Sequence, residues 1–119
     1  MLKGKKKKEE PEQLDPYRSL MADRINAVLY PGSKPARMME NLALLGVTPG
    51  KGFDDFKEET KIDDWFADES QAGPIRYTSL TCGLSPLVGE NGKLLRFYRN
   101  RKYVDGKTHP ELFIGPGRE

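Results

Sequence analysis

The sequence predicts a mixed α+β fold, and three observations lead to this prediction. Residues 14–47 place apolar side chains at the three- and four-residue spacing of helices. Residues 73–119 instead carry short β-branched and aromatic runs separated by turn residues. Between them, residues 48–72 alternate aromatic side chains with acids, which favours short acidic helices. The predicted order is a disordered basic N-terminal tail at 1–13, an N-terminal helical hairpin, short acidic helices and a small antiparallel β region.

The composition limits the size of the hydrophobic core. At 119 residues the chain is long enough for one small domain, which we assign to residues 14–119. Only 36% of the residues are apolar, and the chain holds 12 glycines and 9 prolines. We therefore expect a small core with long irregular connections.

The N-terminal stretch MLKGKKKKEEPEQ has no hydrophobic period, and its lysines repel one another. Both features predict a disordered tail over residues 1–13. Such a tail either keeps the chain in solution or acts as an electrostatic arm for phosphate or an acidic protein surface.

Two helices are predicted in the N-terminal half. The first spans 16–29, because Asp15 can accept hydrogen bonds from the first-turn amides and Pro16 lacks only an N–H that has no partner there. The second spans 35–45 and ends at Gly46, which tolerates the left-handed conformation that closes helices. A short connection between two helices favours an antiparallel hairpin.

The next segment is strongly acidic, with eight acids and two lysines over residues 54–69. Phe53 and Phe56 can share one face of a short helix, and a capping box at Thr60 predicts a second short helix that carries Trp65. Each helix has too little apolar surface to be stable alone. Trp65 is therefore expected to bury against the hairpin or against a partner.

Three or four short antiparallel strands are predicted from residue 73 onward. Residues 75–82 are rich in β-branched and aromatic side chains, and the Asn91–Gly92 pair favours a tight hairpin within 86–98. The Asp105–Gly106 pair is a second turn signal, followed by a short apolar run at 111–115.

The sequence holds little that favours catalysis. Its single cysteine, Cys82, is expected to be a small buried residue, and its single histidine, His109, is expected in an exposed loop. One Cys and one His cannot form a structural zinc site, and the acids of 54–69 lack the spacing of a calcium loop. We therefore expect a protein that is not an enzyme, with no catalytic residues, no cofactor and no metal.

The cysteine count and the hydropathy also indicate a compartment. A single cysteine excludes an internal disulfide, and a reducing interior, either the cytoplasm or the inside of an organelle, is the simplest location. No apolar run approaches the roughly 18 residues of a membrane span. The basic N-terminus is not followed by the apolar stretch of a secretory signal.

The stretch KLLRFYRNRKYV, residues 93–104, is the main candidate for binding, because it places cations among aromatic rings without an acid. Arginine and tyrosine are enriched at binding hot spots. Both alternating sets of positions are mixed, so neither face is purely apolar or polar, and an edge strand is predicted. The candidate partner-binding residues are Arg96, Phe97, Tyr98, Arg99, Arg101, Lys102, Tyr103 and Trp65.

Three interpretations of this stretch remain open. Its cations can be covered by the acidic segment of the same chain, can contact a protein partner, or can neutralise phosphates while the rings stack on RNA bases. The expected function is a non-catalytic accessory or structural subunit that binds protein partners within a larger intracellular assembly. The alternative is a small RNA-binding protein that uses residues 93–103 and the lysine tail.

Overall fold

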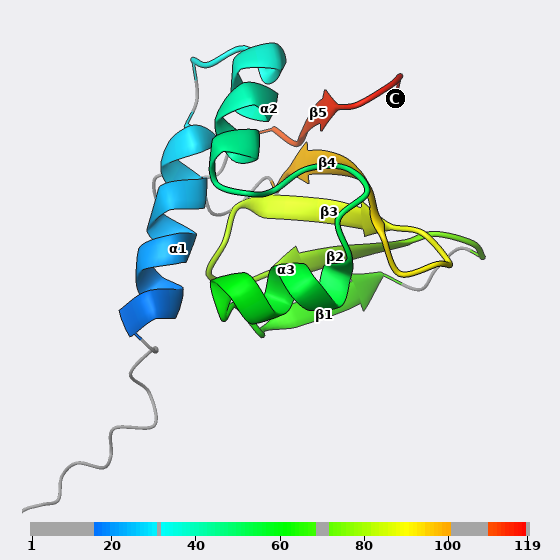
Figure 1. Cartoon of the computed structure of the whole chain (residues 1–119). Helices are drawn as coiled ribbons and strands as arrows, with labels where there is room; N and C mark the ends of the chain where they lie inside the picture. The colour runs from blue at the N-terminus through cyan, green and yellow to red at the C-terminus, as the bar shows by residue number, and fades with distance from the viewer. Residues whose placement is uncertain (1–15, 31, 69–71, 101–109, 119) are drawn as a thin grey trace, which may run out of the picture.

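The computed structural model describes residues 16–30, 32–68, 72–100 and 110–118. These residues form three helices and one five-stranded antiparallel sheet, which confirms the mixed α+β class (Figure 1). The strands follow one another across the sheet in chain order, β1-β2-β3-β4-β5. The elements are α1 (Pro16–Val28), α2 (Pro35–Leu44), α3 (Phe53–Thr60), β1 (Trp65–Asp68), β2 (Ile75–Ser79), β3 (Leu84–Val88), β4 (Leu94–Arg99) and β5 (Leu112–Gly115).

The first two helices form close to the predicted positions. At the end of α2, the amide of Val47 donates to the carbonyl of Leu42 and the amide of Gly46 donates to that of Ala43, both at 2.9 Å. Gly46 has a φ of 85°, so these bonds form the closure that its position predicts. However, α2 packs more closely against β5 than against α1, so α2 belongs to the layer over the sheet, and the predicted pairing of the two helices as a hairpin is not confirmed. None of the described helices is long and apolar enough to cross a membrane.

The core lies between the helices and one face of the sheet. It includes an aromatic cluster in which Phe53 and Phe56 of α3 contact Trp65 of β1, with ring centroids 5.7 and 5.6 Å apart. Tyr77 of β2 lies 4.5 Å from Phe53. Such pairs contribute about 0.5–1.5 kcal/mol each beyond the area that they bury. Trp65 therefore packs within the chain, and α3 is held on the sheet by rings from two strands.

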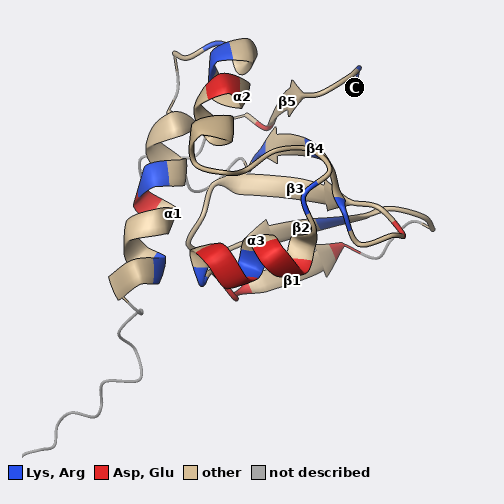
Figure 2. Cartoon of the chain, viewed as in Figure 1, with Lys and Arg blue, Asp and Glu red and all other residues tan. Residues whose placement is uncertain are grey.

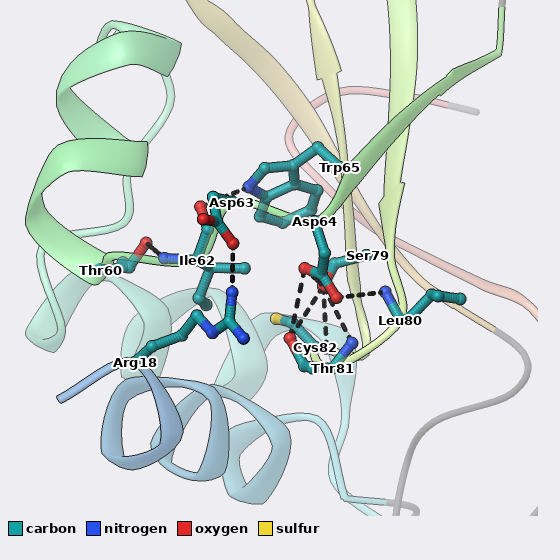
Figure 3. A network of polar contacts seen from close by, with 10 residues as sticks. All are labelled: Arg18, Thr60, Ile62, Asp63, Asp64, Trp65, Ser79, Leu80, Thr81 and Cys82. Carbon is teal, nitrogen blue, oxygen red and sulfur yellow. Dashed lines mark hydrogen bonds and ion pairs between the residues drawn. The ribbon is translucent and has the colours of Figure 1, made fainter. Parts of the chain in front are cut away.

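The predicted second acidic helix is wrong, because the chain turns into β1 instead. Thr60 does not cap a new helix: its hydroxyl accepts from the amide of Ile62 (Figure 3). The same hydroxyl donates to the carbonyl of Phe56 and so closes α3. Lys61 follows in the left-handed conformation, with a φ of 62°. Trp65 then pairs with Ser79 of β2, so the backbone of this segment forms hydrogen bonds within the sheet. A helix this short would be only marginally stable by itself.

The described part of residues 73–119 contains four strands, β2 to β5, in agreement with the three or four that the sequence predicts; the fifth strand of the sheet, β1, arises from the acidic segment. The predicted hairpin at Asn91–Gly92 is present between β3 and β4: the amide of Gly89 donates to the carbonyl of Lys93, and Gly92 has a φ of 81°. The turn signal at Asp105–Gly106 lies outside the described residues.

The prediction that residues 93–104 form an edge strand is also wrong for the described part of that stretch. β4 pairs with β3 on one side and with β5 on the other, so β1 and β5 are the edges. Phe97 at its centre is fully buried among the core residues. The mixture of apolar and polar residues along β4 has another cause, a bulge in its pairing with β3.

Truncating the aromatic cluster should destabilise the whole fold. We expect Phe56→Ala to lower the free energy of unfolding by about 3–5 kcal/mol, because Phe56 is fully buried between α3 and the sheet. Leu44→Ala is the matched control: this side chain is 83% exposed on α2, and the change should stay within about 0.5 kcal/mol. Urea denaturation of both variants measures the difference, and equal losses would contradict this account of the core.

Candidate functional site

The two faces of β4 differ in their surroundings. Leu94 and Phe97 point into the core under the helices, whereas Arg96 and Tyr98 lie on the opposite face. A bulge explains the mixed sequence pattern, because the register places Leu94 beside Val88 and Arg96 beside Leu87, which leaves Leu95 as an extra residue. Leu95 is 37% exposed.

The strand registers define a face of the sheet on which none of the described helices packs. We call it the open face, and it carries two rows of side chains that run across the strands. The first row is Asp68, Arg76, Leu87 and Arg96. The second row is Phe66, Thr78, Ser85, Tyr98 and Phe113.

Arg76 holds the middle of the open face together. Its guanidinium lies 4.0 Å from the ring centroid of Tyr98 and forms an ion pair with Glu111, just before β5. Its Nε atom also donates to the hydroxyl of Ser85 at 3.0 Å. Tyr98 packs in addition against Phe113, with ring centroids 5.4 Å apart. One arginine from β2 thus reaches across β3 and β4, and only 8% of Tyr98 remains exposed.

Two hollows flank this arrangement. The first, of about 370 Å³, is polar and mixed in charge, since its lining includes two acids and one arginine. It is lined by Asp68, Arg76, Thr78, Ser85, Asn100 and Glu111. Its arginine is already paired with Glu111, so this hollow has no net attraction for an anion.

The second hollow, which we call the Arg96 groove, has about 430 Å³ and a mainly apolar lining. Its lining residues are Pro74, Leu87, Leu95, Arg96, Pro116 and Gly117. Within the described ranges, no hydrogen bond or ion pair reaches the guanidinium of Arg96. The groove therefore combines apolar walls with one cation whose hydrogen-bonding capacity is unused.

The structure separates the residues that the sequence grouped as a candidate site. Phe97 and Trp65 face the core, and the Nη2 atom of Arg99, which is largely buried, donates to the carbonyl of Pro110 at 3.1 Å. Tyr98 lies on the open face under Arg76, and only Arg96 lines the apolar groove. The remaining three candidates, Arg101, Lys102 and Tyr103, lie outside the described residues.

Sequence reasoning missed the other half of the groove. Leu87 and Pro74 come from β3 and the start of β2, and Pro116 follows β5, so they meet Arg96 only through the sheet register. Arg76 was also missed, although its place two residues before Thr78 in a predicted strand puts both on one face.

The acidic segment does not cover the cations of β4. Acids concentrate on α3 and beside it (Figure 2), where Glu59 pairs with Lys51 at 2.8 Å and Asp63 pairs with Arg18 of α1. Within the described ranges, none of these acids pairs with Arg96 or Arg99. The interpretation that this segment neutralises the stretch internally is therefore wrong for these two arginines.

Asp64 has a structural role at the β2–β3 connection (Figure 3). Its carboxylate accepts hydrogen bonds from the hydroxyl of Ser79 at 2.6 Å, from the amide of Leu80 at 3.2 Å and from the hydroxyl of Thr81 at 3.3 Å. Asn26 of α1 holds the same connection, because it donates to the carbonyl of Thr81. These bonds fix the turn against α1, and they leave the Asp64 carboxylate fully engaged.

The chemistry of Cys82 follows from its burial in this connection. The side chain is a free thiol with no exposed surface, and burial raises its pKa to about 12, while the backbone of Leu84 lowers it and nearby Asp64 raises it further. The thiol is therefore protonated at neutral pH and does not act as a nucleophile in the folded chain. His109 lies outside the described ranges, within which no three His, Cys, Asp or Glu side chains gather as a metal site would require.

The fold and the open face define the chain as an α+β protein with a sheet that helices cover on one side. No family model matches the chain, and no curated protein and no solved structure is significantly similar to it. Within the described residues, the open face carries the features that indicate a function.

Native Cys82 should resist thiol reagents. Because its pKa lies about three units above the ordinary value of 9.0, the thiolate is depleted about a thousandfold, and we expect reaction with Ellman's reagent to slow by at least that factor at pH 8. The same chain unfolded in urea serves as the control. Rapid native reaction at the unfolded rate would contradict the burial of this thiol.

Proposed function

We propose that the chain is a non-catalytic accessory or structural subunit of a larger intracellular assembly, and that the open face is its partner-binding surface. The observation that carries this proposal is the Arg96 groove, where an arginine without a partner in the described ranges lines an apolar hollow. Clusters of exposed apolar side chains on a folded protein commonly mark interaction sites. Arginine beside such a cluster has the composition of a binding hot spot.

The rest of the open face supports the same proposal. Phe66 on β1 is more than half exposed, and Leu95 stands out from the bulge in β4. Between them, Arg76 and Tyr98 form a fixed centre that needs no further partner. A preorganised polar centre with apolar side chains near it loses little conformational entropy when a partner binds.

A binding role agrees with the state of the single cysteine of the chain. The Cys82 thiol is buried and protonated, so it supports packing and not covalent catalysis. The chain also contains one cysteine, and a free buried thiol is ordinary in a reducing interior. This is the basis for placing the proposed assembly inside the cell.

RNA is the alternative partner, but the open face gives it less support. Stacking on bases requires a free ring face, and the ring of Tyr98 is already covered by Arg76 and Phe113. The lining of the neighbouring polar hollow holds two acids and one arginine, so its net negative charge would also disfavour a phosphate backbone. An RNA-binding role would therefore depend on the lysine tail and on residues 101–103, which lie outside the described ranges.

Charge reversal and polar substitution on the open face should release the partner. With the tagged full-length chain as bait in the cells that make it, we expect Leu87→Asp and Arg96→Glu each to reduce the main co-purifying protein by about tenfold or more, measured by quantitative mass spectrometry. Arg37→Glu on α2 is the matched control, since Arg37 is exposed on a helix away from this face. If both open-face variants retain the partners of the wild type and the thermal midpoint is unchanged, the proposed surface is wrong.

The same variants separate protein from RNA. Fluorescence anisotropy with a labelled single-stranded RNA should show that Arg96→Glu changes affinity by less than about twofold, because the proposal places no phosphate contact in the groove. Tight binding that falls steeply with salt and is lost in Arg96→Glu would instead assign the open face to nucleic acid.

A further inference from the structure

We propose that the Arg96 groove binds a short peptide segment of a protein partner that presents a carboxylate next to an aliphatic or aromatic side chain. The proposal rests on the proposed function, because it specifies the partner chemistry at the open face. The carboxylate of the ligand would pair with Arg96, which lines this one hollow of the open face.

The groove is built from separate segments that the sheet brings together. Leu87 on β3 lies directly beside Arg96 on β4 in the register, so an apolar wall and a cation are immediate neighbours. Pro74 closes the groove at the start of β2, and Pro116 and Gly117 close it after β5. At Gly117 a Cβ atom would lie 3.9 Å from Nε of Arg96, which places the C-terminal turn in contact range of the guanidinium.

Arg96 differs from Arg76 and Arg99, the other arginines of the described strands, and from Arg18 of α1. Arg76 pairs with Glu111, and Arg18 pairs with Asp63. Arg99 donates to a backbone carbonyl. Arg96 alone among these four has no such contact within the described ranges, although it is partly buried.

A carboxylate is the anion that fits this cation best. The planar guanidinium offers a fork of donors that matches the two oxygens of a carboxylate, and partial burial strengthens such a bidentate pair relative to one in bulk water. The flanking apolar walls disfavour a ligand that is charged throughout, because they would desolvate it without returning hydrogen bonds. A phosphate backbone, with a charge at every nucleotide, therefore fits less well than a single acidic residue.

The apolar part of the ligand is inferred from the position and exposure of Leu95. The bulge in β4 turns this side chain outward, and bulges often re-aim a residue next to a functional site. Leu95 contributes with Leu87, Pro74 and Pro116 to a hollow of about 430 Å³, which falls within the range of pockets that hold small ligands. An aliphatic or aromatic side chain beside the acid would cover this surface and exclude water from the arginine.

The test selects peptides with the folded full-length chain and then swaps the charges. Short random peptides displayed on phage are selected on the immobilised wild-type chain, and we expect enrichment of sequences with Asp or Glu adjacent to Leu, Ile or Phe. Synthetic copies of the enriched peptides are then measured by fluorescence anisotropy. Arg96→Glu should weaken their binding by about tenfold or more, and Arg37→Glu should leave it unchanged.

The charge swap gives a readout that a merely structural role of Arg96 would not produce. A copy of the enriched peptide with Lys in place of its acid should bind Arg96→Glu better than it binds the wild type. Leu95→Asp should weaken the original peptide without this reversal, because it disrupts the apolar wall and not the ion pair.

Several results would overturn the proposal. These are the absence of acid–apolar enrichment, equal binding of the enriched peptides to Arg96→Glu, or displacement of the peptide by poly(U) RNA with a steep salt dependence. If the peptides fail while Leu87→Asp still releases the cellular partner, the open face remains the partner surface and only the ligand chemistry is wrong. If the cellular partner is also retained by both open-face variants, the proposed function fails with it.

Discussion

The position of β4 inside the sheet is the constraint on which the rest of the structure depends. Because β4 pairs on both sides, successive side chains are fixed on opposite faces, with Phe97 in the core and Arg96 and Tyr98 on the open face. The helices cover only the face that carries Phe97, where the aromatic residues of α3 meet β1 and β2. One face of this basic and aromatic strand therefore packs in the core, and the opposite face carries the side chains that we propose to contact a partner.

The limited apolar content of the chain explains why one face stays open. With 36% apolar residues, the three described helices supply enough surface for one layer of core, and the second face depends on polar contacts. Arg76 is the main such contact, since its stacking on Tyr98 and its pair with Glu111 link β2, β4 and the start of β5. A stacked, partly desolvated arginine contributes roughly 1–2 kcal/mol. Arg96 makes no such contact with any residue that the structure describes, which leaves a groove with unused binding capacity.

The helices and the central hairpin were predictable because their signals are local. Apolar spacing located α1 and α2, Gly46 marked the end of α2, and Asn91–Gly92 located the turn between β3 and β4. β1 was not predictable in this way, since a short run around Trp65 becomes a strand only when β2 supplies its hydrogen-bond partners. Of the described residues that the sequence proposed for binding, only Arg96 lines the groove. The rest of the groove arises from register between distant segments and from a bulge, and neither has a clear local signature.

Site-specific photo-crosslinking tests the central claim most directly. A photoreactive amino acid at position 95, on the open face, should form a covalent link to the partner protein in intact cells, because Leu95 lines the groove. The same amino acid at position 44, where Leu44 is exposed on α2, should not link that partner. Crosslinking from position 44 but not from position 95 would show that the partner binds the helical side and would contradict the account.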